Sequence, residues 1–504
     1  MARYAGAAGG MLLFLVHVAS AQFTQQGNKL VGTGAVGTAN QGDKVAISED
    51  GNTVIVGGPY DNSTAGAAWV FTRSGDVWSQ QGSKLVGVGA VGPARQGSSV
   101  ALSADGNTAI VCGEYDDSYA GAAWVFTRSG GVWSQQGSKL VGTGAIGAAF
   151  QGVSVAISAD GTTAVIGGPE DNSQAGAVWV FTRNGGAWSQ QGSKLVSADA
   201  VGGAAQGWSV ALSADGNTAI VGGPGDKSDA GAAWVYTRSG TIWSQQGAKL
   251  VGAGAVGIAQ QGVSVAISAD GNTIVVGGNK DNSSVGGTWV YTRIGGMWSQ
   301  QGGKLVGTDA VGAGRQGVAA SISGDGNSAI VGGWQDNSGA GAAWVYTRSG
   351  QVWSQQGSKL VGTDGVGAGG QGISVAISAD GRTAIVGAWA DDSAVGAAWV
   401  YVANGCATPS VNGQPQNQSI QSGQTATLSV TATGTAPVSY QWYQGDAGDT
   451  STPVGSDAST FTTAPQASTA SYWVRVTNAC GSADSATAMV TVTRGVRRHL
   501  HRST

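Results

Sequence analysis

The chain has 504 residues, 88 of them Gly, and only 11% of its residues are charged. This length predicts two or more domains, and the composition predicts many tight turns between uncharged strands. The net charge of −4 gives no electrostatic basis for binding nucleic acid. Residues 22–493 contain no histidine, which excludes a Ser-His-Asp triad, a Cys-His pair and a histidine-ligated zinc from that region. Glutamate occurs only as Glu49, Glu114 and Glu170, so paired-carboxylate chemistry would depend mostly on Asp.

Residues 1–21 have the pattern of a secretory signal peptide. Arg3 lies in a short basic region, an apolar run follows at 11–18, and residues 19–21 form a small-residue cleavage site. The apolar run is much shorter than the roughly 20 residues that a membrane-spanning helix needs, and no later run is longer. We therefore expect a soluble, secreted protein, extracellular or at the cell surface, whose mature chain begins at Gln22.

A repeat of 55 residues fills most of the chain. One Trp recurs in "AWVF"-like segments, at Trp69, Trp124, Trp179, Trp234, Trp289, Trp344 and Trp399. An Asp in "DGNT"-like segments keeps the same step from Asp50 to Asp380. The chain therefore contains seven equivalent repeat units.

Each repeat unit predicts four β-strands. In residues 151–205, four short runs rich in β-branched and aromatic residues end in Gly, Asn, Asp or Ser, and no window has the periodicity of a helix. Asp-Gly between the first two runs and Asn-Gly-Gly between the last two are hairpin signals. Four antiparallel strands repeated seven times predict an all-β fold, a seven-bladed β-propeller with one blade for each repeat unit.

The start of the mature chain completes this ring. The segment "FTQQGNKLVG" at 23–32 lies 55 residues before the equivalent segment that begins at Trp78, whereas unrelated sequence follows the seventh repeat unit. We expect this segment to supply the fourth strand of the seventh blade and to close the ring without a covalent bond. The Trp69 series alternates with small residues on the third strand, so we expect it to pack between blades rather than bind a ligand. The same expectation applies to the Trp of the "WSQQ" segments.

The segment "QGVSVAISADGTTAVIGGPEDNSQAGAVWVFTR" at 151–183 resembles an FG-GAP repeat, the blade unit of integrin α-subunit propellers and of many secreted bacterial proteins. Gln151-Gly152 stand where that family has Phe-Gly, and the likeness covers residues 22–404. Calcium-binding members carry several aspartates in the turn between the first and second strands, because Ca²⁺ takes about six to eight oxygen ligands. That turn holds a single Asp in "SADGNT". It therefore predicts a type I′ turn, and we expect no calcium, other metal or cofactor.

Residues 405–493 resemble an immunoglobulin-like β-sandwich. Trp442 stands at the position of the buried Trp of such domains, and Tyr472 stands at the tyrosine corner. Val430 and Val474 occupy the positions where antibody domains place their cysteine pair. The resemblance therefore implies an apolar core without that bridge.

Three cysteines and a basic tail remain. Cys406 precedes the first strand of the immunoglobulin-like domain and Cys480 lies in its last hairpin. These two segments meet at one end of such a fold, so we expect a disulfide between them in an exported protein. Cys112 replaces a Gly of the second strand, and we expect a buried free thiol. The tail at 494–504 is expected to be a solvated terminus, with anchoring to lipid or a polyanion as the alternative.

The loops at one end of the ring differ most between repeat units. They follow the second strand and precede the first strand, and their candidate ligand contacts include Tyr60 and Tyr115. Drift among duplicated units and selection for a ligand both explain this variation. A ring of aspartates lies on the same end: Asp61, Asp116, Asp171, Asp226, Asp281, Asp336 and Asp391. We expect these residues to form Asx-turns that fold the loops rather than a metal site.

The strongest candidate site is formed by Trp334 and Trp389, which occupy equivalent loop positions in the sixth and seventh repeat units. A large apolar ring at an exposed turn is typical of a platform on which a sugar ring stacks. Gln335, Asp336 and Asp391 are the expected polar anchors. The alternative is that each Trp folds onto its own loop.

Two classes of function remain. The first is a secreted, non-catalytic binding or adhesion protein, expected to be a monomer, that engages an extracellular glycan or a surface protein through these loops. The second is a secreted polysaccharide lyase or hydrolase that uses Asp or Glu on the same end. Catalysis needs one asymmetric site with an acid and a base of separated pKa. Equivalent loops, the lack of histidine and the scarcity of glutamate favour the binding protein.

Overall fold

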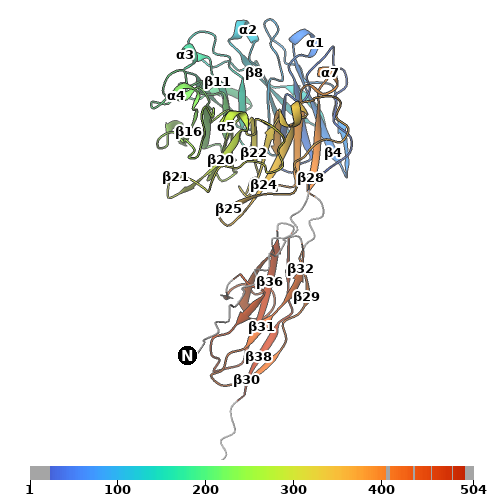
Figure 1. Ribbon diagram of the computed structural model, residues 1–504, viewed down its shortest axis with the longest axis vertical. Helices are drawn as coiled ribbons and strands as arrows, with labels where there is room; N and C mark the ends of the chain where they lie inside the picture. The colour runs from blue at the N-terminus through green and yellow to red at the C-terminus, as the bar shows by residue number, and fades with distance from the viewer. Residues whose placement is uncertain (1–22, 404–408, 435–437, 456, 479–480, 494–504) are drawn as a thin grey trace, which may run out of the picture. The chain divides into compact units, whose positions relative to one another are not determined.

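The computed structural model describes residues 23–403, 409–434, 438–455, 457–478 and 481–493. These residues form two compact parts, Phe23–Ala403 and a second part that starts after it (Figure 1). The predicted signal peptide, Cys406, Cys480 and the basic tail lie outside the described residues.

The first part consists of four-stranded antiparallel sheets, one for each repeat unit, which we number 1 to 7. Sheet 1 contains β2 (Lys44–Ile47), β3 (Thr53–Gly58), β4 (Ala67–Ser74) and β5 (Val77–Gln80). Sheet 2 contains β6 (Ser99–Leu102), β7 (Thr108–Gly113), β8 (Ala122–Ser129) and β9 (Val132–Gln135). Sheet 3 contains β10 (Ser154–Ile157), β11 (Thr163–Gly168), β12 (Ala177–Asn184) and β13 (Ala187–Gln190). Sheet 4 contains β14 (Ser209–Leu212), β15 (Thr218–Gly223), β16 (Ala232–Ser239) and β17 (Ile242–Gln245).

The remaining sheets follow the same order, except that the last takes a strand from the start of the chain. Sheet 5 contains β18 (Ser264–Ile267), β19 (Thr273–Gly278), β20 (Gly287–Ile294) and β21 (Met297–Gln300). Sheet 6 contains β22 (Ala319–Ile322), β23 (Ser328–Gly333), β24 (Ala342–Ser349) and β25 (Val352–Gln355). Sheet 7 contains β26 (Ser374–Ile377), β27 (Thr383–Ala388), β28 (Ala397–Ala403) and β1 (Phe23–Gln25).

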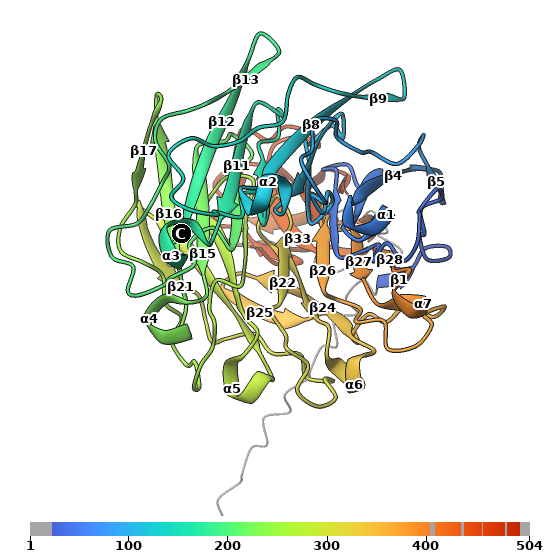
Figure 2. The ribbon, with the colours of Figure 1, turned by 90° about the horizontal axis from the view of Figure 1, so that it is seen from above.

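The pairing of β1 with β28 confirms the predicted closing strand. The two strands are antiparallel, with Phe23 opposite Ala403, and Leu30 N further along donates to Ala398 O at 2.7 Å. Backbone hydrogen bonds also link each sheet to the next and return to the first, where Ala379 N donates to Glu49 O at 3.0 Å. Seven sheets that close a circle around a central channel are consistent with a β-propeller (Figure 2).

The Trp69 series packs between sheets, as predicted. Trp69 is fully buried and lies in one apolar cluster with Ala376, Ile385 and Ala398 of sheet 7. Its indole nitrogen donates to Thr33 O at 2.8 Å, so the polar atom of the ring is also satisfied.

The Trp of the "WSQQ" segments has a different structural role. Trp78 is half-buried beneath the Arg73 guanidinium, 5.4 Å from the ring centre. Its indole nitrogen donates to Gln26 Oε1 at 2.9 Å. The cation, the ring and the amide therefore hold neighbouring outer strands together.

The turn between the first and second strands is not the predicted type I′ turn. Type I′ needs positive φ at both central residues, but neither Glu49 nor Asp50, which lie between Ser48 and Gly51, has positive φ. Instead, Gly51 N donates to Ser48 O at 3.0 Å, and Asp50 Oδ1 accepts from the Ser48 hydroxyl and from Asn52 N. The single carboxylate is thus used inside the turn.

The loop after each second strand contains a four-residue helical turn. These are α1 (Asp61–Thr64), α2 (Asp116–Tyr119), α3 (Asp171–Gln174), α4 (Asp226–Asp229), α5 (Asp281–Ser284), α6 (Asp336–Gly339) and α7 (Asp391–Ala394). All seven lie at the same end of the ring, which we call the loop end and which Figure 2 views from above.

The second part is an antiparallel-rich β-sandwich. Its strands are β29 (Ser410–Gly413), β30 (Gln418–Gln421), β31 (Thr427–Ser429), β32 (Thr431–Thr433), β33 (Ser439–Gln444), β34 (Pro453–Val454), β35 (Thr460–Thr462), β36 (Ala470–Asn478), β37 (Gly481–Asp484) and β38 (Ala488–Thr493). The largest sheet has the order β30-β38-β36-β33-β34, with β37 also paired to β36. Trp442, Val430, Val474 and Tyr472 are all buried in one apolar cluster, as the immunoglobulin resemblance implied.

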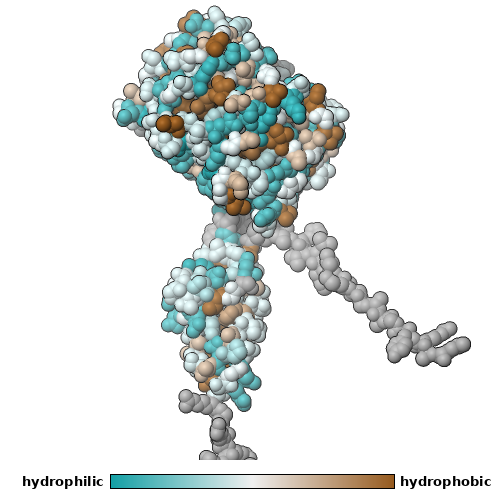
Figure 3. Space-filling model, turned by 90° about the vertical axis from the view of Figure 1, so that its left-hand side faces the viewer, coloured by the Kyte–Doolittle hydropathy of each residue, from teal (hydrophilic) through white to brown (hydrophobic). Residues whose placement is uncertain are grey.

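The surface of the first part carries scattered apolar side chains among hydrophilic ones (Figure 3). The most exposed include Val77, Val132 and Met297 at the outer hairpins. Within the described residues, no helix has the length and apolar character to span a bilayer.

Candidate binding surface at the loop end

Each helical turn at the loop end has left-handed backbone. In α1, Asn62 and Ser63 have φ of 49° and 55°, a conformation that L-residues seldom adopt in succession. Asp61 stabilises it through two bonds to distant segments: Oδ1 accepts from Val36 N at 2.7 Å, and Oδ2 accepts from Lys84 Nζ at 2.5 Å. Asp61 is itself buried. The carboxylate therefore ties the loop to the linker before its repeat unit and to the linker after it.

The prediction of Asx-turns in this ring of aspartates was wrong. An Asx-turn bonds a carboxylate to backbone two residues on, whereas these carboxylates bond to residues far along the chain. The same arrangement recurs in every repeat unit, where each Asp forms an ion pair with a Lys. The sequence could not show this bond, because its partners lie 23 or more residues apart and no local pattern links them.

Two of the predicted polar anchors belong to this ring and are not accessible to a ligand. Asp336 pairs with Lys359 and Asp391 pairs with Lys29, and each Asp side chain is only 1% exposed. Their oxygens also accept the backbone N–H of Val311 and Val366. Of the three predicted polar anchors, Gln335 therefore remains as a candidate ligand contact, and it is half-buried next to Trp334 in the chain.

Trp334 and Trp389 are both half-buried and lie on either side of Gly370. A Cβ atom at Gly370 would stand 3.2 Å from Trp389 Nε1 and 3.8 Å from Trp334 Cε3. The absence of a side chain at Gly370 therefore leaves room between the two rings. On its other side, Trp334 faces the Arg315 guanidinium, 5.6 Å from the ring centre. The structure thus brings the two predicted aromatic residues to one place.

Tyr60 and Tyr115 are also brought together, through a residue that the sequence did not single out. The Arg95 guanidinium lies between them, 4.6 Å from the Tyr60 ring centre and 3.9 Å from that of Tyr115. Tyr115 in turn contacts Tyr119 edge to face, and Tyr119 stacks on Phe150 at 5.0 Å. Cation–π contacts of this kind hold a guanidinium in a fixed place.

A cavity of about 220 Å³ lies beside Arg95, between sheets 1 and 2. Its lining includes Asp43, Lys44, Tyr60 and Glu114. Glu114 is only 9% exposed, and one of its oxygens, Oε2, has no hydrogen-bond partner. Burial raises the pKa of the Glu114 carboxyl, and the Arg95 guanidinium, whose Nη1 lies 3.8 Å from Glu114 Oε1, opposes that rise only in part.

The sequence contained one usable signal for Arg95 and Glu114. Both stand at positions that vary between repeat units, next to positions that do not. The sequence did not reveal that the residue before each Gln-Gly pair lies between the loops of two successive units. Arg95 obeys this rule between Tyr60 and Tyr115, and Gly370 obeys it between Trp334 and Trp389.

The described residues also include candidate metal ligands and one cysteine. Among these described residues, no group of three or more His, Cys, Asp or Glu is placed to hold a metal ion. Cys112 is buried and free, as predicted, and burial raises the pKa of its thiol.

Comparison with known proteins supports the assignment of the second part of the chain as an immunoglobulin-like domain. Residues 407–493 match a family model described as an Ig-like domain that is CHU_C associated. Domains of this kind are typical of extracellular and surface proteins. No curated protein matches the chain.

Solved structures of titin and twitchin segments also match part of the chain. A chimeric titin Z1Z2 functionalized with a peptide from decorin is 20% identical, with 18% of this chain and 96% of that chain covered, at a TM-score of 0.15. A titin M10 complex with an obscurin-like 1 Ig mutant is 22% identical, with 18% of this chain and 95% of that chain covered, at a TM-score of 0.15. The twitchin kinase region of C. elegans is 15% identical, with 17% of this chain and 16% of that chain covered, at a TM-score of 0.15.

Proposed function

We propose that the chain is a secreted, non-catalytic binding or adhesion protein that engages an extracellular glycan through the loop end. The observation that carries this proposal is the pair Trp334 and Trp389, held on either side of Gly370. The match of residues 407–493 to an Ig-like domain family supports an extracellular or surface location.

The chemistry of the Trp pair suits a sugar. Both rings are half-buried, so part of each ring is fixed by packing while part remains accessible. Sugar rings present apolar C–H faces that stack on aromatic rings, and a few polar groups then fix their orientation. Gln335 and Arg315 are the polar side chains beside Trp334 that serve this purpose.

The proposal also includes a more specific fold for the first part of the chain. Residues 22–404 would form an FG-GAP-type, seven-bladed propeller, and the closed circle of backbone hydrogen bonds supports it. Such a ring presents loops from successive units side by side, as in other propellers that bind at one end. The protein is expected to act as a monomer and without a cofactor. It is also expected to act without calcium, because the Asp50 carboxylate already accepts hydrogen bonds within its own turn.

One observation favours the alternative, a polysaccharide lyase or hydrolase. The Glu114 cavity is a single asymmetric site with a buried carboxyl of raised pKa and a second carboxylate, Asp43, in its lining. Catalysis on polysaccharides needs such a pair. Release of reducing sugar from a polysaccharide panel, lost on Glu114→Gln, would establish the enzyme instead.

The proposal is tested by replacing both Trp residues with Ala. We expect the Trp334→Ala, Trp389→Ala variant to lose binding on a glycan array, because the stacking surface is gone, while its melting temperature changes little. Trp208→Val is the matched control: Trp208 is an exposed Trp of sheet 4, and the equivalent residues Val153, Val263 and Val318 show that Val fits there.

Retained binding together with a large loss of stability would contradict the proposal. It would show that the two rings form the packing core of their own loops.

A further inference from the structure

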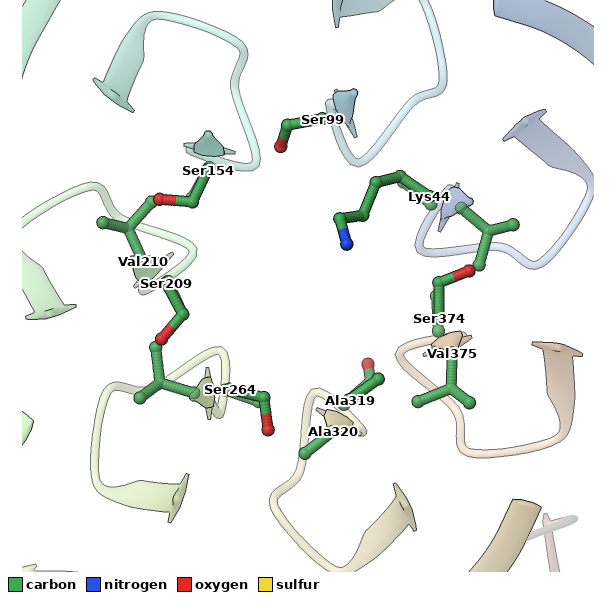
Figure 4. Close-up of a pocket in the computed structure, with 18 of the residues that line it drawn as sticks. Lys44, Ser99, Ser154, Ser209, Val210, Ser264, Ala319, Ala320, Ser374 and Val375 are labelled. Carbon is green, nitrogen blue, oxygen red and sulfur yellow. The ribbon is translucent and has the colours of Figure 1, made fainter. Parts of the chain in front are cut away.

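The central channel is a second candidate site, separate from the Trp pair. It is a cavity of about 680 Å³ enclosed by the first strands of all seven sheets. This volume lies within the range of about 300–1,000 Å³ found for ligand pockets. Figure 4 shows one equivalent position of each first strand around the channel, held by Ser in five units, by Ala319 and by Lys44.

The charge of this lining is unusual for the protein. Among the described residues that line the channel, the charged ones are Lys44 and Arg315, and neither forms an ion pair with a described residue. No Asp or Glu is found in that described lining, although acidic residues outnumber basic ones in the whole chain. The Lys44 side chain extends into the open centre (Figure 4). Lys44 also lines the neighbouring cavity that contains Asp43 and Glu114, but it forms an ion pair with neither. Two cations without an ion-pair partner in a partly enclosed cavity favour an anionic ligand.

The channel also offers an unused hydrogen-bond acceptor. Asn279 lines it beside Arg315, is only 6% exposed, and its Oδ1 has no hydrogen-bond partner. Arg315 Nε is likewise a buried donor without a partner. Buried polar atoms are normally satisfied, so an acceptor and a donor left unpaired in one cavity indicate a place where a ligand binds. Such a ligand must accept from a cation and donate to an amide oxygen.

A ring of apolar side chains narrows the channel toward its far end, and Ser48, Glu49 and Ser103 are among the residues that line the cavity beyond this ring. An Ile or Leu from each first strand, from Ile47 in sheet 1 to Ile377 in sheet 7, lines both the channel and a smaller cavity of about 140 Å³ beyond it. Arg315, Asn279 and Trp208 line only the larger cavity, toward the loop end. An anionic ligand is therefore expected on the loop side of this ring, where Lys44 and Arg315 lie, rather than on the far side, where Glu49 lies.

We propose that the channel binds a small hydroxylated carboxylate of the acidic-sugar class. Its carboxylate would pair with Lys44 and Arg315, and a hydroxyl would donate to Asn279 Oδ1. Phosphate or sulfate satisfies the cations but offers no neutral hydroxyl chain to fill the cavity. This site shares Arg315 with the proposed glycan platform but uses neither Trp ring, so the Lys44→Ser and Trp389→Ala variants distinguish the failure of one proposal from the failure of the other.

The repeat supplies variants that keep the fold. Lys44→Ser restores the residue found in five other units, and Arg315→Gln places at 315 the residue that Gln260 provides at the same left-handed backbone position. We expect digalacturonate to bind the full chain by calorimetry, and each substitution to weaken it about tenfold or more, because a charge-assisted hydrogen bond is lost. Lys227→Asn, an exposed charge change at a position where other units carry Asn, is the matched control.

Three further measurements complete the test. The dimethyl ester of digalacturonate keeps the hydroxyls and removes the charge, and we expect it not to bind. Trp389→Ala should retain digalacturonate, even where it loses the neutral glycan of the proposed function. Absence of digalacturonate binding, undiminished binding by the two channel variants, or equal binding of inorganic sulfate would each overturn the proposal.

Discussion

The residue before each Gln-Gly pair determines the local chemistry of the loop end. Arg95, Phe150 and Arg315 hold the same left-handed backbone there, with φ of 57°, 55° and 53°, and Gly370 has φ 67°. L-residues with bulky side chains seldom adopt this conformation. The surrounding repeat imposes it, so the position tolerates any side chain that suits the site. The sequence predicted that these positions vary, but not that each one lies between two loops.

Glu114, whose carboxyl faces Arg95, shows how a buried charge at the loop end affects stability. The pKa of its carboxyl is raised by burial, so the folded protein holds the proton more tightly than the unfolded chain does. The stability that this provides is complete below the unfolded pKa of about 4.3 and is lost as pH rises through the folded pKa. We therefore expect Glu114→Gln to raise the melting temperature at pH 8 and to leave it unchanged near pH 4.

Differential scanning calorimetry across this pH range measures the effect. Glu170→Gln, in the loop of the third repeat unit, is the control and should change neither value. A Glu114→Gln variant that is less stable at pH 8 would show that the contact with Arg95 outweighs the cost of burying the charge.

The strand pattern was predictable at the level of elements, and the loops were not. Four strands in each unit follow from alternating residues and hairpin signals that lie close together in the sequence. Six of the seven Asp–Lys pairs join residues 23 positions apart, as between Asp171 and Lys194, and the seventh joins Asp391 to Lys29 near the start of the chain. No local pattern reveals such a bond. The same limit led to the wrong assignment of Asp336 and Asp391 as ligand anchors.

Removing one Lys of these pairs tests their energy. Lys194→Met keeps the aliphatic stem but leaves the Asp171 carboxylate buried without its cation. We expect a loss of about 3 kcal/mol in the free energy of unfolding, measured by urea denaturation, because breaking a buried ion pair strands a charge.

The double variant Asp171→Asn, Lys194→Met removes that stranded charge and should recover part of the loss. Lys227→Asn, on an exposed part of α4, should cost less than about 0.5 kcal/mol. Equal losses in the Lys194 and Lys227 variants would show that the buried pairs add no more than surface charges.

The closed ring was predictable at the level of the whole molecule, because it follows from the number of repeat units and the constant spacing between them. The offset of 55 residues between Phe23 and Trp78, and the missing segment after the seventh unit, fixed which strand closes the circle. The chemistry of the channel was not predictable in this way. Lys44 belongs to the first repeat unit, and Asn279 and Arg315 belong to the fifth, so only the circle brings them into one cavity.

The closing strand should therefore control the stability of the whole ring. Deleting residues 22–32 removes the buried side chains of Phe23 and Leu30, the pairing of β1 with β28 and the Lys29–Asp391 ion pair. Each large apolar side chain alone is worth about 3 kcal/mol, so we expect the melting transition of the ring to fall sharply. Asn28→Ser, an exposed change to the residue of other units, is the control. A synthetic peptide of residues 22–32 should restore the transition when it is added in excess, because it binds only the folded ring. An unchanged melting temperature in the deletion would show that the ring is held closed by contacts between sheets 7 and 1 without β1.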